Sequence, residues 1–333
     1  MEPLRQFAHE RVAVADPADV GAARRAVKQH AERLHGSSAH AELVATELAT
    51  NLLRHAVPGG WVLTRPVPPD RVEILAVDRG PGIADVAAAV EGHVPEPKGL
   101  GCGLASVRRV SERFDVHTEK DRGTAVLSLV DVRRGRPEHA PRRWAGMSVG
   151  VTEACGDGWA VAEAGGCLAV AVVDGLGHGA SASVAADAVL KAFALDPTDV
   201  EGYVARAHEA ARMTRGAAAT LCVIDPDAEI VRYTAVGNVN GRVVGPSGIR
   251  GLATSNGTLG LQATPPKAQV RTLSWAPDST LVLWTDGLSS RLELEGRADL
   301  LEHDPALVAA VLHRDHTRDR DDATVVVVRS TAT

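Results

Sequence analysis

The second half of the chain contains four aspartate motifs at the ends of expected strands. They are GDGW with Asp157, VVDGLGHG with Asp174, LWTDGLSS with Asp286, and RDDATVVVV with Asp321 and Asp322. Two of them follow long apolar runs typical of central strands, and the last precedes another such run. Carboxylates gathered at buried strand ends are tolerated only beside cations, and all-oxygen ligands favour Mg²⁺ or Mn²⁺ over Zn²⁺. Two such ions bridged by an aspartate and a hydroxide would hydrolyse phosphate esters.

Each motif alone has a simpler interpretation, because Asp-Gly is also the commonest hairpin-turn signal. The joint pattern, rather than any one motif, favours a metal centre. His178, four residues after Asp174, is expected in a surface loop, where it caps the next helix, with a catalytic role as the alternative. Asn238 and Asn240 are expected in a turn. Residues 146–152 contain no arginine.

The first half contains three motifs that together could bind a nucleotide. In ELATNLLRHA, Glu47, Asn51 and His55 recur every four residues and would lie in one row beside an apolar helix face. Alone, this row is more typical of a solvated helix edge. In DRGPGI, Asp78 follows an expected strand, where its carboxylate could accept a hydrogen bond from an exocyclic amine.

The second and third of these motifs contain glycines that would let a ligand approach the backbone. Gly80 and Gly82 would allow a flat ring to approach the backbone, although a Pro-Gly turn has the same composition. In KGLGCGLASVRR, glycines open a helix whose exposed N–H groups suit a polyphosphate. The spacing to Glu119 also fits a dinucleotide fingerprint, but residues 84–98 are expected to form a helix and a Pro-rich loop rather than the strand that this fingerprint requires.

Composition limits the class of protein. The chain has 333 residues, of which 45% are hydrophobic, with a net charge of −6 and a mean hydropathy of −0.04. The length suggests two domains. A membrane span, a secretion signal and a nucleic-acid-binding surface are not expected. The four cysteines are scattered, which argues against a disulfide framework and against a cysteine zinc site, and fits the cytoplasm.

Periodicity and turn residues predict antiparallel sheets with helices on their faces, an α+β fold. We expect a linker at 133–146, which is basic, contains prolines and has neither structural period. The expected strands are 11–15, 61–64, 71–77, 114–118, 124–130, 168–173, 219–224, 229–235, 270–275, 280–284 and 324–329. The expected helices are 16–34, 39–56, 106–113, 180–194, 200–212 and 304–313.

Taken in order, the three motifs of the first half resemble the GHKL ATPase fold, in particular the small serine kinases of the RsbT and RsbW type. Gly123-Thr124 before a strand also matches, and the resemblance covers residues 10–130. It implies a Bergerat-type α/β sandwich over residues 1–132 that binds ATP and Mg²⁺. It further implies that Glu47 is the general base and that Asn51 holds Mg²⁺ between the phosphates of ATP. Around the adenine ring, Asp78 would bind the amino group, Thr124 would support this contact, and Gly80 and Gly82 would line the ring. Gly99, Gly101 and Gly103 would cradle the phosphates.

The second half resembles the metal-dependent (PPM) serine/threonine phosphatases, in particular the SpoIIE/RsbX branch. The matching segments are ACGDGWAV, VVDGLGHGASA, VGNVNGRV, NGTLG, TDGLSS and RDDATVVVV. The resemblance implies an αββα sandwich over residues 147–333 that binds two Mn²⁺ or Mg²⁺ ions. It implies that Asp174 bridges the ions, that the Gly175 carbonyl group and Asp157, Asp286 and Asp321 complete the ligand set, that Glu153 assists from outside it, and that Asp322 is the alternative to Asp321.

Together the two resemblances imply a bifunctional regulator of bacterial partner switching. The kinase and the phosphatase would act on a STAS-type anti-sigma-factor antagonist, with a sigma factor or a downstream phosphatase as further partners. The alternative is a phosphatase whose N-terminal domain binds a sigma factor or another partner, or gates the phosphatase, without catalysis. A metal-binding domain without catalytic activity is the third possibility.

Overall fold

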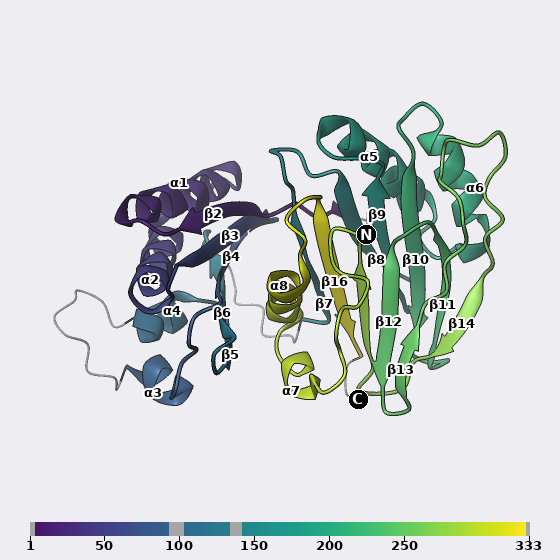
Figure 1. Ribbon diagram of the computed structural model, residues 1–333. Coiled ribbons are helices and arrows are strands. Elements are labelled where there is room, and N and C mark those ends of the chain that lie inside the picture. Colours follow the sequence, from purple (N-terminus) through teal and green to yellow (C-terminus); the bar gives the residue numbers. More distant parts are fainter. Residues whose placement is uncertain (1–3, 93–102, 134–141, 331–333) are drawn as a thin grey trace. The chain divides into compact units, whose positions relative to one another are not determined.

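The computed structural model describes residues 4–92, 103–133 and 142–330. The chain forms two compact units (Figure 1). The N-terminal unit comprises His9–Pro141 together with Glu302–Arg314, and the C-terminal unit comprises Met1–Ala8, Arg142–Leu301 and Asp315–Thr333. The units therefore depart from a division into consecutive halves, since a short segment from each end of the chain belongs with the other half.

The N-terminal unit has a five-stranded antiparallel sheet in the order β2-β3-β4-β6-β5. Its strands are β2 (Glu10–Val14), β3 (Gly60–Val67), β4 (Arg71–Asp78), β5 (Arg113–Glu119) and β6 (Gly123–Asp131). Its helices are α1 (Pro17–Arg33), α2 (Ala39–His55), α3 (Val86–Glu91), α4 (Gly103–Val110) and all but the end of α8 (Pro305–His316).

Local signals determine where helix α1 begins. The side chain of Asp16 accepts a hydrogen bond from the Ala18 N–H group, and the Asp19 carboxylate accepts one from the backbone of Asp16, at 2.9 Å each. Together with Pro17 in the first turn, this reciprocal pair satisfies N–H groups that a helix start leaves without partners.

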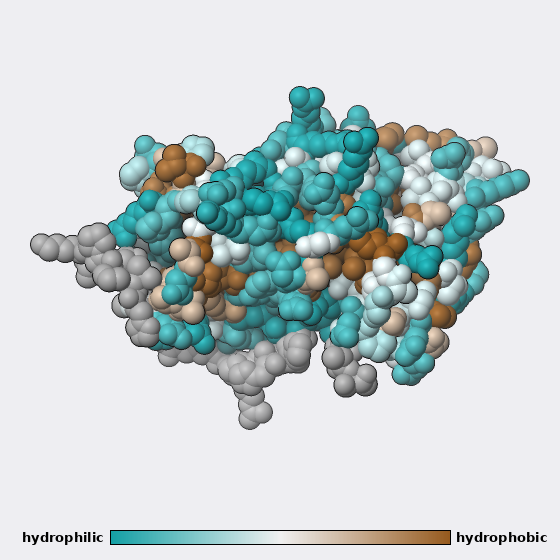
Figure 2. Space-filling model, turned by 60° about the horizontal axis from the view of Figure 1, so that its bottom comes forward, coloured by the Kyte–Doolittle hydropathy of each residue, from teal (hydrophilic) through white to brown (hydrophobic). Residues whose placement is uncertain are grey.

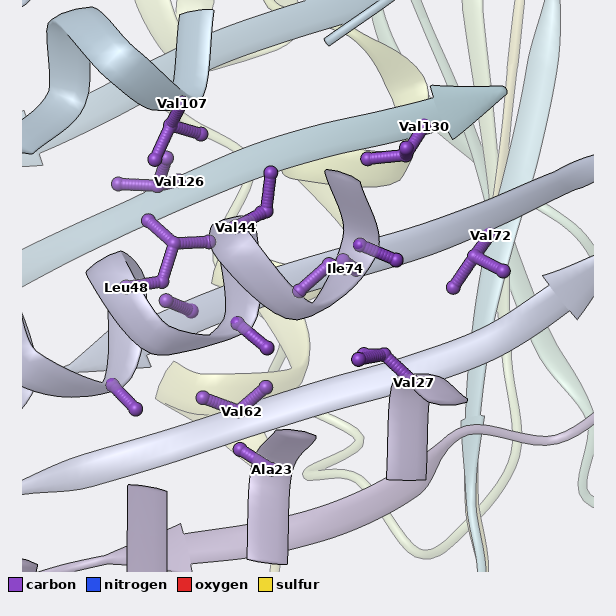
Figure 3. Close-up of a cluster of buried hydrophobic side chains, with 14 of the residues drawn as sticks. Ala23, Val27, Val44, Leu48, Val62, Val72, Ile74, Val107, Val126 and Val130 are labelled. Atoms are coloured by element: carbon purple, nitrogen blue, oxygen red, sulfur yellow. The ribbon is translucent and has the colours of Figure 1, made fainter. Parts of the chain in front are cut away.

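Helices α1, α2 and α4 cover one face of this sheet and bury a core of small aliphatic side chains (Figure 3). Val44 and Leu48 of α2 point toward Ile74 of β4 and Val126 of β6, and all four are at most 5% exposed. The apolar spacing on α2 therefore holds this helix, with its polar row, directly against the central strands.

The segment that contains α8 is attached to this unit by specific hydrogen bonds. The carboxylate of Asp115 on β5 accepts one bond from the Asp304 N–H group at 2.8 Å and lies 2.9 Å from Nδ1 of His303. At the other end, the buried guanidinium group of Arg314 donates to the carbonyl oxygen of Asp78 at 3.2 Å. These bonds explain why a helix far along the chain belongs to the N-terminal unit.

The C-terminal unit is a sandwich of two antiparallel sheets, in the orders β1-β8-β9-β10-β11-β14 and β13-β12-β15-β16-β7. The strands are β1 (Leu4–Arg5), β7 (Trp144–Val149), β8 (Asp157–Ala164), β9 (Cys167–Gly175), β10 (Ala217–Asp225), β11 (Ile230–Val236), β12 (Asn240–Gly245), β13 (Gly248–Gly251), β14 (Arg271–Ser274), β15 (Thr280–Trp284) and β16 (Ala323–Arg329). The helices are α5 (Ala180–Leu195), α6 (Val200–Ala211) and α7 (Ala298–Leu301).

Strand β9 shows how the layers are built. Leu168, Val170 and Val172 join the core between the two sheets, whereas Ala169, Ala171 and Val173 join the core under α5 and α6. Successive side chains point to opposite faces of a strand, so a strand that is buried on both faces has a continuous apolar sequence. The apolar run before Asp174 therefore marks a central strand, as expected.

The α+β class and the two-part architecture are confirmed. Residues 144–146, expected in the linker, instead begin β7, and residues 134–141 of that linker lie outside the described part. A Cβ atom on Gly146 would lie 2.8 Å from the Trp159 ring, so the packing of this ring requires a glycine here. Because glycine is unfavourable in a strand, the local sequence signal for β7 is weak. Arg113, expected at a helix end, begins β5. Within the described residues, no helix is both long enough and apolar enough to span a membrane.

Candidate functional site

The register of β8 and β9 brings two of the predicted aspartates together. Asp157, the first residue of β8, pairs directly with Asp174 near the end of β9. Both side chains continue the series that faces the second sheet, because Trp159 and Val172, two residues away from them, lie in the core between the sheets. The two carboxylates therefore lie on the same face of adjacent strands, at one end of the sandwich.

The second sheet contributes a hydroxyl network to this end. Oγ1 of Thr285 donates to Oδ2 of Asp157 at 2.7 Å and accepts a hydrogen bond from the Thr324 N–H group at 2.9 Å. The hydroxyl groups of Thr324 and Ser148 lie 2.7 Å apart. Thr285 was not predicted as a site residue; its position immediately before Asp286, at the end of an apolar strand, is the signal that could have identified it.

Burial and mutual repulsion dominate the electrostatics of the carboxylates. Burial, followed by the charges of Asp157, Asp286, Asp321 and Asp322, raises the pKa of Asp174 to about 9. Burial also raises the pKa of Asp157, although hydrogen bonds from the neighbouring threonines lower it. Several carboxylates in one partly dehydrated site cannot all be ionised at neutral pH unless cations compensate them.

Asp286 lies within this electrostatic group and has partners of its own. Its pKa is raised, first by burial and then by the charge of Asp321, and lowered by Asn238 and by Arg318. Asn238 donates a hydrogen bond from Nδ2 to the Asp286 carboxylate. We expected Asn238 to be only a turn residue, so its contact with a predicted metal ligand is a role that the sequence did not reveal.

The two members of the Asp321-Asp322 doublet have different environments. The buried carboxylate of Asp322 accepts hydrogen bonds from the Val151 N–H group at 2.8 Å and from the Gly156 N–H group at 2.5 Å, so it fastens two loop segments. Asp321 is only partly buried, and its charge acts on both Asp174 and Asp286. This difference favours Asp321 over Asp322 as the residue available to a cation.

The donor set suits a hard divalent cation that retains water. Across residues 4–92, 103–133 and 142–330, no group of three or more His, Cys, Asp or Glu side chains is placed so that it could hold a metal ion. Mg²⁺ is commonly held by one or two carboxylates and several waters, and the adjacent carboxylates of the buried Asp157 and the partly buried Asp174 gain most from a positive charge. Gly175, the other predicted ligand, is crowded, since a Cβ atom there would collide with the Ala182 carbonyl group.

Two further residues near the motifs are placed in solvent. Glu153 and His178 are both exposed. His178 lies in the loop before α5, as expected, but the N-cap position of that helix is Gly179, and no side chain caps it.

In the N-terminal unit, strand β4 ends at Asp78, whose carboxylate accepts backbone hydrogen bonds on one of its two oxygen atoms. Oδ1 of Asp78 accepts hydrogen bonds from the Gly80 N–H group at 2.7 Å and from the Thr124 N–H group at 3.2 Å. Among the described residues, none donates to Oδ2. Burial raises the pKa of Asp78, whereas these two hydrogen bonds lower it. Asp78 therefore has a fixed orientation and a second oxygen that can accept a bond from a ligand amine.

The loop after Asp78 is packed too closely for larger residues. A Cβ atom on Gly82, whose φ is +83°, would lie 2.8 Å from the Glu119 carbonyl oxygen, and one on Gly123, at φ +105°, would collide with the carbonyl group of Asp78. Oγ1 of Thr118 joins the two segments: it accepts from the Ile83 N–H group at 2.9 Å and lies 3.0 Å from the Thr124 hydroxyl group. Thr118 is a second residue that the motifs did not indicate.

The polar row of α2 lies at the edge of the core, as expected. Glu47 and Asn51 are partly buried, and His55 is exposed. A Cβ atom on Gly80 would lie 3.4 Å from the His55 carbonyl oxygen, so the end of α2 meets the loop after Asp78. Gly103 begins α4 at φ +49°, and the predicted phosphate-binding residues Gly99 and Gly101 lie outside the described residues.

The geometry thus defines two classes of domain in one chain: a helix-covered antiparallel sheet with a glycine-lined carboxylate, and a two-sheet sandwich with coupled acidic residues at one end. Residues 13–129 match the model of the histidine kinase-like ATPase domain, and residues 164–331, just over half of the chain, match that of Stage II sporulation protein E (SpoIIE). The chain belongs to the SpoIIE family and carries a serine/threonine phosphatase domain of the PPM type.

Two curated relatives from Bacillus subtilis (strain 168) each match part of the chain. The serine/threonine-protein kinase RsbT is 28% identical over 116 residues, which cover 33% of this chain and 87% of RsbT. The phosphoserine phosphatase RsbX is 31% identical over 140 residues, which cover 40% of this chain and 68% of RsbX. A solved structure from work on the bacterial stressosome covers 56% of this chain and 98% of its own, with a TM-score of 0.52 and 24% identity, and so shares the fold.

Proposed function

We propose that this protein is a bifunctional regulator of partner switching. Its C-terminal unit would hydrolyse phosphoserine or phosphothreonine with the help of divalent cations, and its N-terminal unit would transfer phosphate from ATP to serine or threonine. The protein substrate in both directions would be a STAS-type anti-sigma-factor antagonist in the cytoplasm. A sigma factor or a downstream phosphatase would be a further partner.

The pairing of Asp157 with Asp174 is the observation that carries the phosphatase proposal. Two carboxylates side by side on adjacent strands, one of them with a pKa raised to about 9, form a site that is unfavourable without cations. We propose that Asp157, Asp174, Asp286, Asp321 and the Gly175 carbonyl group would hold two Mg²⁺ or Mn²⁺ ions. Such ions supply Lewis-acid activation of a water molecule and of the phosphoryl oxygens.

The residues of the chain would then prepare the site for reaction. The Thr285 hydroxyl group donates to Oδ2 of Asp157 and so orients this carboxylate for a cation or water. Asn238 orients Asp286 in the same way. Asp322 ties the Val151 and Gly156 segments together and so fixes the approach to the carboxylates of Asp157 and Asp174. Such prior positioning limits the reorganisation needed during the reaction.

The kinase proposal rests on the arrangement of α2 and β4. Asp78 would accept a hydrogen bond from the adenine amino group on Oδ2, with Thr124 holding its other oxygen. Asn51 would ligate the Mg²⁺ ion of ATP, and Glu47, one helical turn away, would accept the proton of the attacking hydroxyl group. Phosphoryl transfer depends mainly on positioning, a metal ion and a base, and these residues would supply the positioning, a ligand for the metal ion and the base.

The substrate proposal is drawn from the two relatives. RsbT is named a serine/threonine-protein kinase and RsbX a phosphoserine phosphatase, and here segments similar to both occupy one chain. A kinase and a phosphatase in one polypeptide would set the phosphorylation level of one shared partner. The free cysteines Cys155, Cys167 and Cys222 are consistent with a reducing compartment.

One observation favours a second candidate function, in which the N-terminal unit binds nucleotide and gates the phosphatase without phosphorylating a partner. Arg314 donates to the carbonyl group of Asp78, and Arg79 donates to the carbonyl group of Arg314. The proposed adenine-reading residue is therefore bonded to α8, and Asp321 follows seven residues after Arg314. Nucleotide turnover distinguishes the two functions, since gating requires binding alone.

Both activities can be tested on the full-length protein. With labelled ATP and a purified STAS-domain protein, we expect label on the STAS protein, and we expect Glu47→Ala to abolish it. Nucleotide binding with no label transferred to any partner would instead support the gating function. For the phosphatase, we expect Mn²⁺-dependent hydrolysis of p-nitrophenyl phosphate, abolished by Asp174→Asn. Activity retained by the Asp174→Asn variant would refute the proposed metal site.

A further inference from the structure

We propose that Arg215, in the turn between α6 and β10, binds the phosphate group of the substrate, and that exposed apolar residues around it bind the flanking protein segment. This inference rests on the proposed phosphatase activity and specifies its substrate as a phosphoserine or phosphothreonine within an apolar segment. The motifs indicated the metal ligands but no cation for the phosphate, which is the gap that Arg215 would fill.

The register of β9 and β10 places Arg215 beside the loop that follows Asp174. Asp174 pairs with Ala218 on β10, and the Leu176 N–H group donates to the Gly216 carbonyl oxygen at 2.9 Å, which continues the pairing past the strand end. The next position opposite Arg215 is Gly177. A Cβ atom on Gly177 would lie 3.3 Å from Nη1 of Arg215, so the guanidinium group lies directly over this glycine.

The charge of Arg215 is available to a ligand. Its side chain is exposed, and among the described residues no acidic group forms an ion pair with it. The neighbouring Arg212 instead forms a pair with Glu209 at 3.5 Å. A guanidinium group can bind a phosphate through two parallel hydrogen bonds. Beside a group of carboxylates, a positive charge would also reduce the repulsion that a phosphate dianion meets on approach.

A second arginine near the site has a different role. The charge of Arg318 lowers the pKa of Asp286, whereas burial and Asp321 raise it. Arg318 therefore compensates a carboxylate, so we assign the phosphate to Arg215.

Large apolar side chains surround Arg215 on the surface. Leu176 is 50% exposed, Leu261 is 55% exposed and Met213 is 97% exposed. Two of them contact Gly216, the residue next to Arg215: the Leu176 N–H group donates to its carbonyl oxygen, and a Cβ atom on Gly216 would lie 2.9 Å from Cγ of Leu261. Met213 precedes Arg215 by two residues. The surface of the molecule is largely hydrophilic where Figure 2 shows it, with hydrophobic residues in separate patches. An exposed apolar cluster next to an unpaired cation matches a phosphorylated segment of a protein rather than a small sugar phosphate.

Steady-state kinetics on the Mg²⁺-loaded full-length protein test this proposal. The substrates are p-nitrophenyl phosphate and two phosphoserine peptides, one flanked by leucines and the other by glycines. Binding of inorganic phosphate is measured separately by calorimetry. The variants are Arg215→Ala, Arg215→Lys, the double change of Met213→Ser with Leu261→Ser, and Arg212→Ala as the matched control, with thermal unfolding to confirm that each variant folds.

We expect Arg215→Ala to raise KM about tenfold or more for every substrate and to weaken phosphate binding similarly, with a smaller effect on kcat. Arg215→Lys should recover part of the loss, and Arg212→Ala should match the parent. The double serine variant should raise KM for the leucine-flanked peptide alone. KM and phosphate affinity within twofold of the parent for Arg215→Ala would overturn the proposal. A parent protein that binds phosphate through Arg215 but hydrolyses nothing would refute the phosphatase proposal and leave this binding site standing.

Discussion

Replacement of Asp174 by asparagine should separate the stability of the protein from its activity. Burial and four neighbouring aspartates raise the pKa of Asp174 to about 9, against an ordinary value of 3.8. At pH 7 the metal-free folded chain therefore keeps this carboxyl group protonated, whereas the unfolded chain ionises it. At about 1.4 kcal/mol per pH unit, this difference lowers the free energy of unfolding by about 4 kcal/mol.

Asparagine has the same shape and no charge, so the Asp174→Asn variant lacks this penalty. Allowing about 1–2 kcal/mol for altered hydrogen bonds, we expect the metal-free variant to be more stable than the parent by about 2–3 kcal/mol at pH 7. Because the folded pKa of this acid is raised, its unfavourable contribution begins near pH 4, grows as the pH rises and levels off near pH 9. The gain from the substitution should follow the same pH dependence.

Urea unfolding followed by circular dichroism, in EDTA at about pH 5, 7 and 9, measures this gain. Asp227→Asn, the same change at an exposed aspartate, is the control and should leave stability unchanged. Added Mg²⁺ or Mn²⁺ should reverse the order, since an ion bound only by the folded parent stabilises it. The reasoning would be refuted if the Asp174→Asn variant were folded in EDTA yet no more stable than the parent at pH 9.

Three further changes test the N-terminal unit. Glu47→Gln should reduce phosphorylation of a STAS partner by about a hundredfold or more while nucleotide affinity, measured by calorimetry, stays within threefold; an active variant would exclude Glu47 as the base. Gly123→Ala should lower the free energy of unfolding, measured in urea, by about 2–4 kcal/mol, because a Cβ atom would collide with the Asp78 carbonyl group. The control Gly165→Ala, at a positive φ but with nothing within 4 Å of the new Cβ atom, should lower it by only about 1 kcal/mol. Equal losses in the two variants would contradict the proposed crowding at Gly123. Burial, and then the charge of a neighbouring arginine, lower the pKa of His30 from 6.5 to about 4. Because the unfolded chain then binds a proton more readily than the folded chain, the free energy of unfolding should fall by about 3 kcal/mol as the pH drops from 6.5 to 4. The His30→Gln variant should lack this loss.

The elements with strong local signals could be predicted from the sequence. The α1 boundary follows from Asp16, Pro17 and Asp19, whose side chains act within one helical turn. Strand β9 follows from an apolar run long enough to be buried on both faces. Strand β7 could not be recognised in the same way, because Gly146 weakens its local strand signal. The reason for this glycine is the ring of Trp159, which lies on a different strand.

The same distinction applies to the candidate sites. The motifs named the aspartates of the acidic centre and the Asp78 loop, because residue type and position at a strand end are local properties. The partners of these residues are not local: Thr285 bonds to Asp157, Asn238 to Asp286, and Arg215 lies over Gly177 through strand pairing and loop packing. None of these contacts has a spacing that a motif could express.

By itself, the sequence determined which chemical groups the chain offers and which segments become helices and strands, since hydrophobic periodicity, caps and turn residues act over a few neighbouring positions. The tertiary structure alone decided that Asp157 faces Asp174, that Asp322 fastens loops while Asp321 stays available, and that residues 302–314 join the N-terminal unit. The physical reason is that burial and electrostatic coupling depend on distance in space, and only the folded chain sets that distance.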